Sequence, residues 1–273
     1  MLKDKLRRLL GDSMVRRLKQ LAGRDQFDEV RLIHEIFRRT GHEGNMVDVG
    51  AHFGIELAMF VDLGWDIVAF EPDPKNRQHL DAAFGDHPRV QIDTRAVSDH
   101  AEAAKPFFAS EQSSGISGLS AFHESHEQAG TVEVTTMANV VQDYGLAAID
   151  FLKIDIEGFD FFAIKGIDWD AAAPDVIICE YENSKTLPLG YTVSDLYAYL
   201  SERGYKITLS EWQPISEYGA QHSWKGFSAT VDTLDPEGWG NLIAFRDQPK
   251  FEMLAVDNIH DLAKQVYPRI FGE

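Results

Sequence analysis

The chain has 273 residues, of which 44% are hydrophobic, and this length suits one large α/β domain with a substantial core. Its formal net charge of −18 argues against non-specific binding of nucleic acids, which requires a basic surface. The charge is uneven, because residues 1–39 contain 11 Lys and Arg against 6 Asp and Glu, leaving 15 basic and 38 acidic residues in the rest. The sequence thus predicts an acidic body with a basic N-terminal arm.

The single cysteine, Cys179, excludes a disulfide within the chain, and its apolar neighbours predict a buried strand thiol. A lone buried thiol fits a reducing compartment. The sequence has no run of about 18 apolar residues, as a membrane-spanning helix requires. Its N-terminus carries charges throughout instead of a secretory apolar stretch. We therefore expect a cytoplasmic protein.

The N-terminal arm, residues 1–44, is expected to be helical. Leucine and valine recur at about every third or fourth position of residues 2–21, which predicts a basic amphipathic helix, and a second helix is expected at 26–39. The first helix could pack on the main domain or on the partner subunit of a homo-oligomer. Alternatively, residues 1–21 could contact an anionic membrane surface and hold the protein at the inner face of that membrane.

Strands and helices alternate from residue 45 to residue 250. Strands are expected at 46–49, 66–70, 89–93, 150–154, 176–181, 205–210 and 241–246. Helices are expected at 53–63, 74–84, 158–165 and 193–203. This alternation predicts a single α/β domain at 45–250, built on a doubly wound, mostly parallel sheet of seven strands with helices on both faces.

Three segments depart from this alternation. They are an insertion at 95–149, with a strand at 131–136 and a helix at 137–144; a long aromatic-rich loop at 211–240; and a C-terminal tail at 251–273, with a helix at 257–270. Long loops in compact domains often carry function. The Gly/Ser-rich sequence SSGISGLS (113–120) is either a flexible connection or a cover over the active site.

The sequence DVGAHFG (48–54) follows the first predicted strand, at the edge where open α/β sheets bind their ligands. A dinucleotide site would need the pattern G-x-G-x-x-G, whereas only Gly50 and Gly54 are present, and Asp48 would repel a phosphate. An acid here suits the positively charged ammonium and sulfonium groups of S-adenosylmethionine. Glu71 ends the next strand, where it could accept hydrogen bonds from both ribose hydroxyls. The alternative is that Asp48 only caps a helix and Glu71 belongs to a surface turn.

Four segments, VDVGAHFG, VAFEPDP, AVSD and DFLKIDIEGFDFFAIKG, resemble the FkbM-type S-adenosylmethionine-dependent methyltransferases in order and spacing over residues 46–182. The resemblance implies a Rossmann-like class I methyltransferase fold and methyl transfer, usually to an oxygen and often on a sugar. It implies that Asp48, Gly50 and Gly54 hold the methionine part of the cofactor and Glu71 the ribose. The other cofactor-binding residues that it implies are Ala51, His52 (where the family commonly has Asn), Pro72, Ala96, Val97, Ser98 and, near the transferable methyl group, Asp155.

The predicted strand FLKIDIEG places charged side chains where a central parallel strand is normally apolar. Lys153, Asp155 and Glu157 share one side of it, so Lys153 is expected to pair with Asp155 or Glu157. The next strand ends in Glu180 and Glu182. Together, Asp155, Glu180 and Glu182 could bind Mg²⁺, Mn²⁺ or Ca²⁺. Alternatively, these side chains could be solvated acids around the crevice. Of the two, a required metal is not favoured.

Transfer to a hydroxyl needs a group that removes the proton, and the candidates are Asp155, Glu180 and His222. Aromatic faces stack on sugars, although the same residues often form a satellite core under a loop. The candidate acceptor-binding residues are Glu157, Glu182, Trp212, Tyr218 and Trp224. Trp224→Ala is accordingly expected to raise the KM for the acceptor and to leave cofactor binding nearly intact.

The sequence therefore predicts an O-methyltransferase that acts on a sugar hydroxyl of a glycan or glycosylated metabolite, as in polysaccharide biosynthesis. One alternative is methyl transfer to nitrogen or to a non-sugar hydroxyl. Another is a scaffold that retains the fold without turnover. The expected partner is a small-molecule or glycan acceptor and not a nucleic acid.

Overall fold

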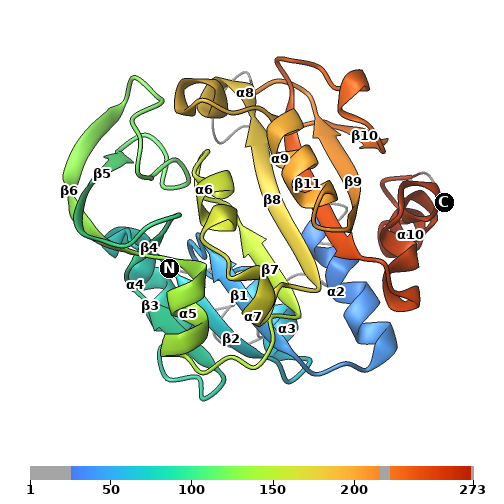
Figure 1. The fold of residues 1–273 in the computed structure, drawn as a ribbon, viewed down its shortest axis with the longest axis horizontal. Coiled ribbons are helices and arrows are strands. Elements are labelled where there is room, and N and C mark those ends of the chain that lie inside the picture. The colour runs from blue at the N-terminus through green and yellow to red at the C-terminus, as the bar shows by residue number, and fades with distance from the viewer. Residues whose placement is uncertain (1–25, 216–221, 272–273) are drawn as a thin grey trace.

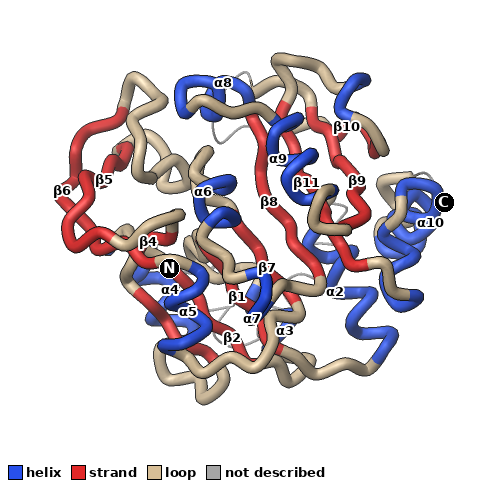
Figure 2. The backbone as a smooth tube through the Cα atoms, in the orientation of Figure 1, coloured by secondary structure: helices blue, strands red, loops and turns tan. Residues whose placement is uncertain are grey.

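The structure is a computed structural model that describes residues 26–215 and 222–271. Its centre is an eight-stranded sheet in the order β10-β9-β11-β8-β7-β1-β2-β3 (Figures 1 and 2). The strands are β1 (Asn45–Val49), β2 (Asp66–Phe70), β3 (Val90–Asp93), β7 (Phe151–Ile154), β8 (Val176–Glu182), β9 (Tyr205–Trp212), β10 (Trp224–Ser228) and β11 (Trp239–Arg246). The predicted fold class, a mostly parallel sheet with helices on both faces, is confirmed.

The sheet has one more strand than the seven predicted. The additional strand, β10, lies within the segment 211–240 that was expected to be a loop, and it pairs antiparallel with β9. The five neighbouring strands β8, β7, β1, β2 and β3 are parallel to one another. Strand β11 runs antiparallel to both of its neighbours, β8 and β9. The carboxyl ends of the parallel strands therefore meet at one edge, where ligands bind in such sheets.

The helices cover both faces, because successive residues of each strand point to opposite sides. One face, with Met46 and Phe151, packs against helices α2 (Glu29–Thr40), α3 (Leu57–Val61), α4 (Pro74–Phe84) and α10 (Val256–Val266). The other face, with Val47 and Leu152, packs against α5 (Met137–Asp143), α6 (Asp160–Lys165) and α9 (Val193–Ser201). Cys179 is fully buried on this second face, as predicted.

The insertion forms a second, three-stranded sheet, where the sequence indicated only one short strand. This sheet, at the left of Figure 1, has the order β4-β6-β5 and contains β4 (Ala96–Val97), β5 (Glu102–Ser110) and β6 (His126–Thr135). The segment 113–120 connects β5 to β6, and Gly118 pairs with Phe108 of β5 through two backbone hydrogen bonds.

Five short elements complete the described chain. They are α7 (Trp169–Ala172), α8 (Asn183–Thr186) and the 3₁₀ turns η1 (Leu187–Leu189), η2 (Val231–Thr233) and η3 (Pro249–Leu254), the last of which leads from β11 to α10. The helix expected at 53–63 is shorter, because His52 and Gly54 have positive φ angles of 49° and 68° that no helix accommodates. None of the helices in the described residues has the length and hydropathy that crossing a membrane requires.

Candidate active site

A cavity of about 210 Å³ lies at the carboxyl ends of β1, β2 and β7, between the main sheet and the insertion. Seven residues that the sequence assigned to the cofactor line it: Gly50, His52, Glu71, Pro72, Ala96, Val97 and Asp155. The structure thus brings the ends of β1, β2 and β7 and the segment Ala96–Val97, which follows β3, together around one cavity. We refer to it as the first cavity.

Gly50 forms the turn that follows β1, and its position allows no side chain. Its φ is 88°, and a Cβ atom there would lie 2.0 Å from the backbone oxygen of Asp155. The backbone N–H groups of Gly50 and Ala51 both donate to the carbonyl of Phe70, which ends β2. Glycine therefore lets three strand ends converge at the cavity wall.

Glu71 is 4% exposed, and both its carboxylate oxygens are already engaged by the backbone. One accepts from the N–H of His52 and the other from the N–H of Asp73, each at 2.8 Å. Burial raises the pKa of Glu71 to about 7. Each oxygen keeps a second lone pair, so the side chain, which lines the first cavity, can still accept bonds from two hydroxyls such as those of a ribose.

The segment 113–120 forms another wall of the first cavity. The ring Nε2 of His52 lies 3.0 Å from the hydroxyl of Ser114, and the side-chain amide of Asn76 donates to the Ser114 carbonyl at 2.9 Å. Ser114, Gly115, Ser117, Gly118 and Leu119 all line the space. This segment is therefore a cover over the cavity, which is the second of the two alternatives that the sequence left open.

Asp48, which the resemblance assigns to the methionine part of the cofactor, does not line the first cavity. It is fully buried beneath the cavity lining, and its carboxylate pairs with Nζ of Lys153 at 3.0 Å. Burial raises the pKa of Asp48 to about 6, and Lys153 opposes this rise. Lys153 was expected to pair with Asp155 or Glu157, and that expectation is wrong, because Asp48 lies opposite it in the register of β1 and β7. Asp48 acts on the cavity by holding Lys153, which lines it.

Three further residues assigned to the cofactor lie behind the lining. Ala51 and Ser98 are buried, and the space beside Gly54 is filled by Leu80 and Phe84 of α4. These positions shape the cavity from behind and do not face it.

A second cavity of about 260 Å³ adjoins the first, and Glu56, Lys153 and Asp155 line both. The three candidate bases meet here, because Asp155, Glu180 and His222 all belong to its wall. The opposite side is formed by Asp28 and Glu29 at the start of α2, by Trp212 and by two residues that sequence reasoning missed, Trp239 and Asn241. Both residues lie at the start of β11, which was predicted to begin at residue 241 and begins at Trp239. The predicted strand was the only sign in the sequence that these residues lie at the edge of the sheet.

The aromatic residues of the segment 211–240 separate into two groups. Trp212 and Trp239 stack at 5.4 Å in the wall of the second cavity, and the ring of His222 meets Trp239 edge-on. Trp224 instead packs on Phe27 at 4.4 Å and donates to Ser210 at 2.9 Å, and it lies half-buried against the hydrophobic core on one face of the sheet. The proposed acceptor role of Trp224 is therefore corrected to one of packing. Tyr218 lies outside the described residues, as do residues 1–21.

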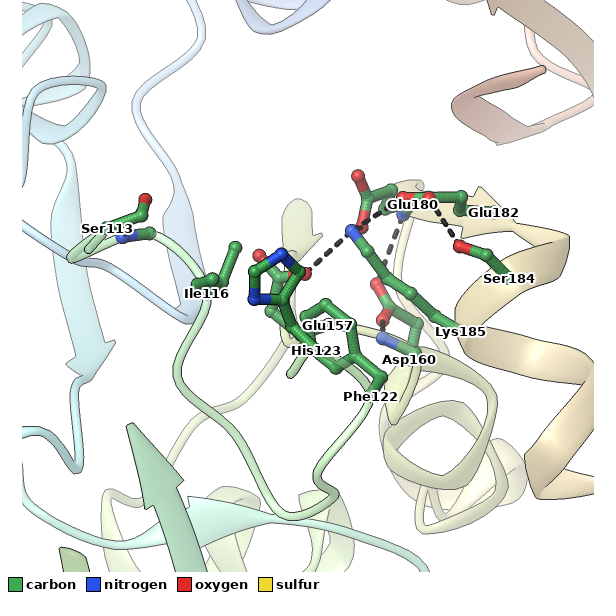
Figure 3. Close-up of polar contacts among 12 residues, drawn as sticks. Ser113, Ile116, Phe122, His123, Glu157, Asp160, Glu180, Glu182, Ser184 and Lys185 are labelled. Carbon is green, nitrogen blue, oxygen red and sulfur yellow. Dashed lines mark hydrogen bonds and ion pairs between the residues drawn. The ribbon is translucent and has the colours of Figure 1, made fainter. Parts of the chain in front are cut away.

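The remaining acids gather around a buried lysine (Figure 3). Nζ of Lys185, in α8, pairs with Glu157 at 2.6 Å and with Glu180 and Glu182 at 2.9 Å each. Burial alone would lower the pKa of Lys185, but the glutamates outweigh it and hold the pKa well above its usual value. Glu157, with a positive φ of 58°, also lines the first cavity, whereas Glu182 lines neither. No sequence pattern pointed to Lys185 beyond its position three residues after Glu182.

The chain resembles several solved structures at low identity. A precorrin-6Y C5,15-methyltransferase from Geobacter metallireducens is 13% identical with a TM-score of 0.43, covering 81% of this chain and 90% of that chain. An O-methyltransferase from Bacillus cereus in complex with SAH is 10% identical with a TM-score of 0.42, covering 90% and 97%. A TehB-like SAM-dependent methyltransferase from Corynebacterium glutamicum is 12% identical with a TM-score of 0.41, covering 85% and 94%. No curated protein matches the chain.

The family comparison covers the predicted cofactor motifs and strands β2, β7 and β8. The methyltransferase FkbM domain matches residues 48–207, which is more than half of the chain. The resemblance seen in the motifs is confirmed over the region that contains Gly50, Glu71 and Asp155. The protein therefore belongs to the FkbM methyltransferase domain family and is an S-adenosylmethionine-dependent methyltransferase.

Proposed function

We propose that the enzyme methylates a hydroxyl oxygen of a sugar, in a glycan or a glycosylated metabolite. The observation that carries this proposal is the pair of adjoining cavities that share Asp155. The first cavity has features that suit a ribose and a methionine tail: the buried carboxylate of Glu71 and the turn at Gly50, which lines the cavity without a side chain. The second cavity is then the space for the acceptor.

The lining of the second cavity suits a sugar ring. The stacked pair of Trp212 and Trp239 offers aromatic surface, and Trp239 Nε1 has no hydrogen-bond partner among the described residues. The side chains of Asn241, Glu29 and His222 add polar groups to the same wall. A ring with an apolar C–H face and several hydroxyls uses both kinds of group, whereas a purely apolar acceptor would leave the polar ones unpaired.

When bound, S-adenosylmethionine supplies a methyl group on a sulfonium, which is a good leaving group. The residues of this chain orient the hydroxyl and accept its proton, which is needed because a sugar hydroxyl is very weakly acidic. Asp155 is exposed and lines both cavities, so it can accept a proton from a group placed between them. Glu180 is bound to Lys185 and His222 lies in the second cavity alone, which favours Asp155 as the base.

The test measures transfer of a labelled methyl group from S-adenosylmethionine to a panel of oligosaccharides, a catechol and simple amines. We expect labelled oligosaccharide methyl ethers as products. Asp155→Asn should lower kcat by about 10²- to 10⁴-fold, the usual contribution of a positioned base. Its affinity for S-adenosylhomocysteine, measured by calorimetry with NAD⁺ as the unrelated ligand, should stay close to that of the unmodified chain.

The matched control is Asp86→Asn, which removes an exposed carboxylate between α4 and β3 and should change neither quantity. Methyl transfer to the amines or the catechol alone would overturn the sugar acceptor. An unchanged kcat in Asp155→Asn would overturn the assignment of the base. Binding of NAD⁺ in place of S-adenosylhomocysteine would overturn the assignment of the first cavity.

A further inference from the structure

Acidic side chains converge at the carboxyl ends of β7 and β8 in an arrangement that resembles a site for a divalent cation. Carboxylate oxygens of Asp155, Glu157 and Glu180 lie within 4.8 Å of one another. Hard divalent cations bind to such sets of oxygen ligands. Asp160 lies beneath the set, where its carboxylate accepts from the backbone N–H groups of Gly158 and Glu180 at 3.2 and 3.1 Å.

A positive charge from the chain itself already lies at this position. Lys185 is 2% exposed, and its Nζ contacts carboxylate oxygens of Glu157, Glu180 and Glu182 at 2.6 to 2.9 Å (Figure 3). An ammonium has three N–H donors, which equals the number of carboxylates around it. Two of the three acids of the cation-like set, Glu157 and Glu180, therefore each have an oxygen bound to Lys185.

The short helix α8 fixes this lysine next to the acids. It begins directly after β8, so Glu182 and Lys185 are three residues apart and lie on the same side of the turn. A side chain anchored in this way cannot leave the cluster without exposing three buried carboxylates to one another. A divalent ion between the same oxygens would lie within contact distance of the ammonium and would be repelled by it.

We propose that Lys185 is the resident cation of this acid cluster, that it takes the place of a divalent metal ion, and that it positions Glu180 in the wall of the second cavity. Methyl transfer then needs no added metal at Asp155, Glu157 and Glu180. This last statement rests on the function proposed above, whereas the assignment of the cation does not.

The experiment titrates the full chain with Mn²⁺ alone and follows the free ion by electron paramagnetic resonance. The unmodified chain and Lys185→Arg should show no binding tighter than about 1 mM, the range of weak oxygen sites. Lys185→Met leaves the carboxylates without their cation. This variant should bind Mn²⁺ at least about tenfold more tightly than the unmodified chain does, because its carboxylate oxygens carry negative charge that nothing balances. Lys264→Met removes a half-exposed surface lysine and serves as the control with no gain.

A double variant keeps the test decisive if Lys185→Met does not fold. Lys185→Met/Glu182→Gln removes one negative charge together with the positive one, retains Asp155, Glu157 and Glu180, and should also gain Mn²⁺ binding. Micromolar binding by the unmodified chain that disappears in Asp155→Asn would overturn the proposal. So would a folded double variant that gains no affinity.

Activity gives a separate readout. EDTA should leave methyl transfer by the unmodified chain unchanged, and loss of activity that Mn²⁺ or Mg²⁺ restores would overturn the proposal. Failure to bind S-adenosylhomocysteine by calorimetry would count against the proposed function and would leave the Mn²⁺ result standing.

Discussion

At the scale of the residue, Glu71 shows how a buried carboxylate in the wall of the first cavity affects stability. Burial raises its pKa from an ordinary value of 4.5 to about 7. Between these two values the folded chain holds a proton that the unfolded chain has released, so the free energy of unfolding decreases as the pH rises. For Glu71 alone the decrease is at most about 3 kcal/mol across this window.

Glu71→Gln removes that contribution, so the stability of the variant should depend less on pH between 4.5 and 7. Urea unfolding at several pH values measures the slope for the variant and the unmodified chain. Buried Asp48 and Asp160, whose pKa values burial raises to about 6, contribute slopes of the same sign, so only the difference between the two proteins is informative. Glu237→Gln, at an exposed position, should reproduce the unmodified slope, and an equally steep slope in Glu71→Gln would contradict the prediction.

At the scale of the element, the turn after β1 can be compared with the turn before β2. Gly50 and Gly64 both have positive φ angles, 88° and 82°. A Cβ atom at Gly50 would lie 2.0 Å from the Asp155 backbone oxygen, whereas at Gly64 nothing lies closer than 3.6 Å. Gly64→Ala should therefore cost only about 1 kcal/mol for its backbone conformation, and Gly50→Ala should cost at least about 2 kcal/mol more.

Chemical denaturation of both variants measures this difference. Calorimetry with S-adenosylhomocysteine should show weaker binding for Gly50→Ala alone, because the Asp155 strand end must move to admit the methyl group. Equal costs and equal affinities in the two variants would mean that the turn after β1 accommodates a side chain.

Strand β10 gives the prediction that replaces the earlier one for Trp224. The indole of Trp224 packs on Phe27 and Phe227, against the hydrophobic core on one face of the sheet. Trp224→Ala should therefore lower the free energy of unfolding by about 2–3 kcal/mol, near the lower end for large-to-small core substitutions because the residue is half-buried. The acceptor KM should stay unchanged at a temperature where the variant is folded. Trp239→Ala should instead raise the acceptor KM, and the reverse pattern in the two variants would restore Trp224 to the acceptor site.

The elements themselves show why sequence reasoning reached the first cavity and missed parts of the second. The predicted strands β1, β2 and β7 had to end at one edge, so Gly50, Glu71 and Asp155 could be grouped from their positions alone. Strands β4, β5 and β10 form by pairing with another strand, β4 parallel to β6, β5 antiparallel to β6 and β10 antiparallel to β9, and local patterns do not reveal such pairing. The partner of Lys153 follows from the register of β1 against β7, and register is a tertiary property.

At the scale of the whole molecule, the second cavity joins segments that are far apart in the sequence. Asp28 and Glu29 come from the first described helix, Asp155 from the middle of the chain, and Trp239 from the last strand. Each of these residues is unremarkable in its own segment, and only the completed sheet, with α2 packed across it, brings them together. The position of the proposed acceptor site, at the carboxyl edge of the sheet, could therefore be predicted, whereas the residues that form it could not.

The distribution of charge over the chain leads to a prediction about where the enzyme works. Residues 1–21 contain seven Lys and Arg and two Asp and Glu, which gives a net charge of +5. Because the whole chain has a net charge of −18, the other residues together have a net charge of −23. A body with this charge is repelled by anionic lipid, and attraction can come only from the basic segment. We expect the full chain to co-sediment with phosphatidylglycerol vesicles and not with phosphatidylcholine vesicles, and we expect salt to weaken the binding.

Deleting residues 1–21 should abolish this co-sedimentation and leave the affinity for S-adenosylhomocysteine unchanged, because the described residues already form the lining of both cavities. A full-length variant with Arg7, Arg8, Arg16 and Arg17 changed to Gln separates charge from length, and it should bind the vesicles as weakly as the deletion does. If the full chain never sediments, the prediction of membrane contact is wrong. If the glutamine variant still sediments, apolar contact by the leucines and not charge would be responsible for the binding.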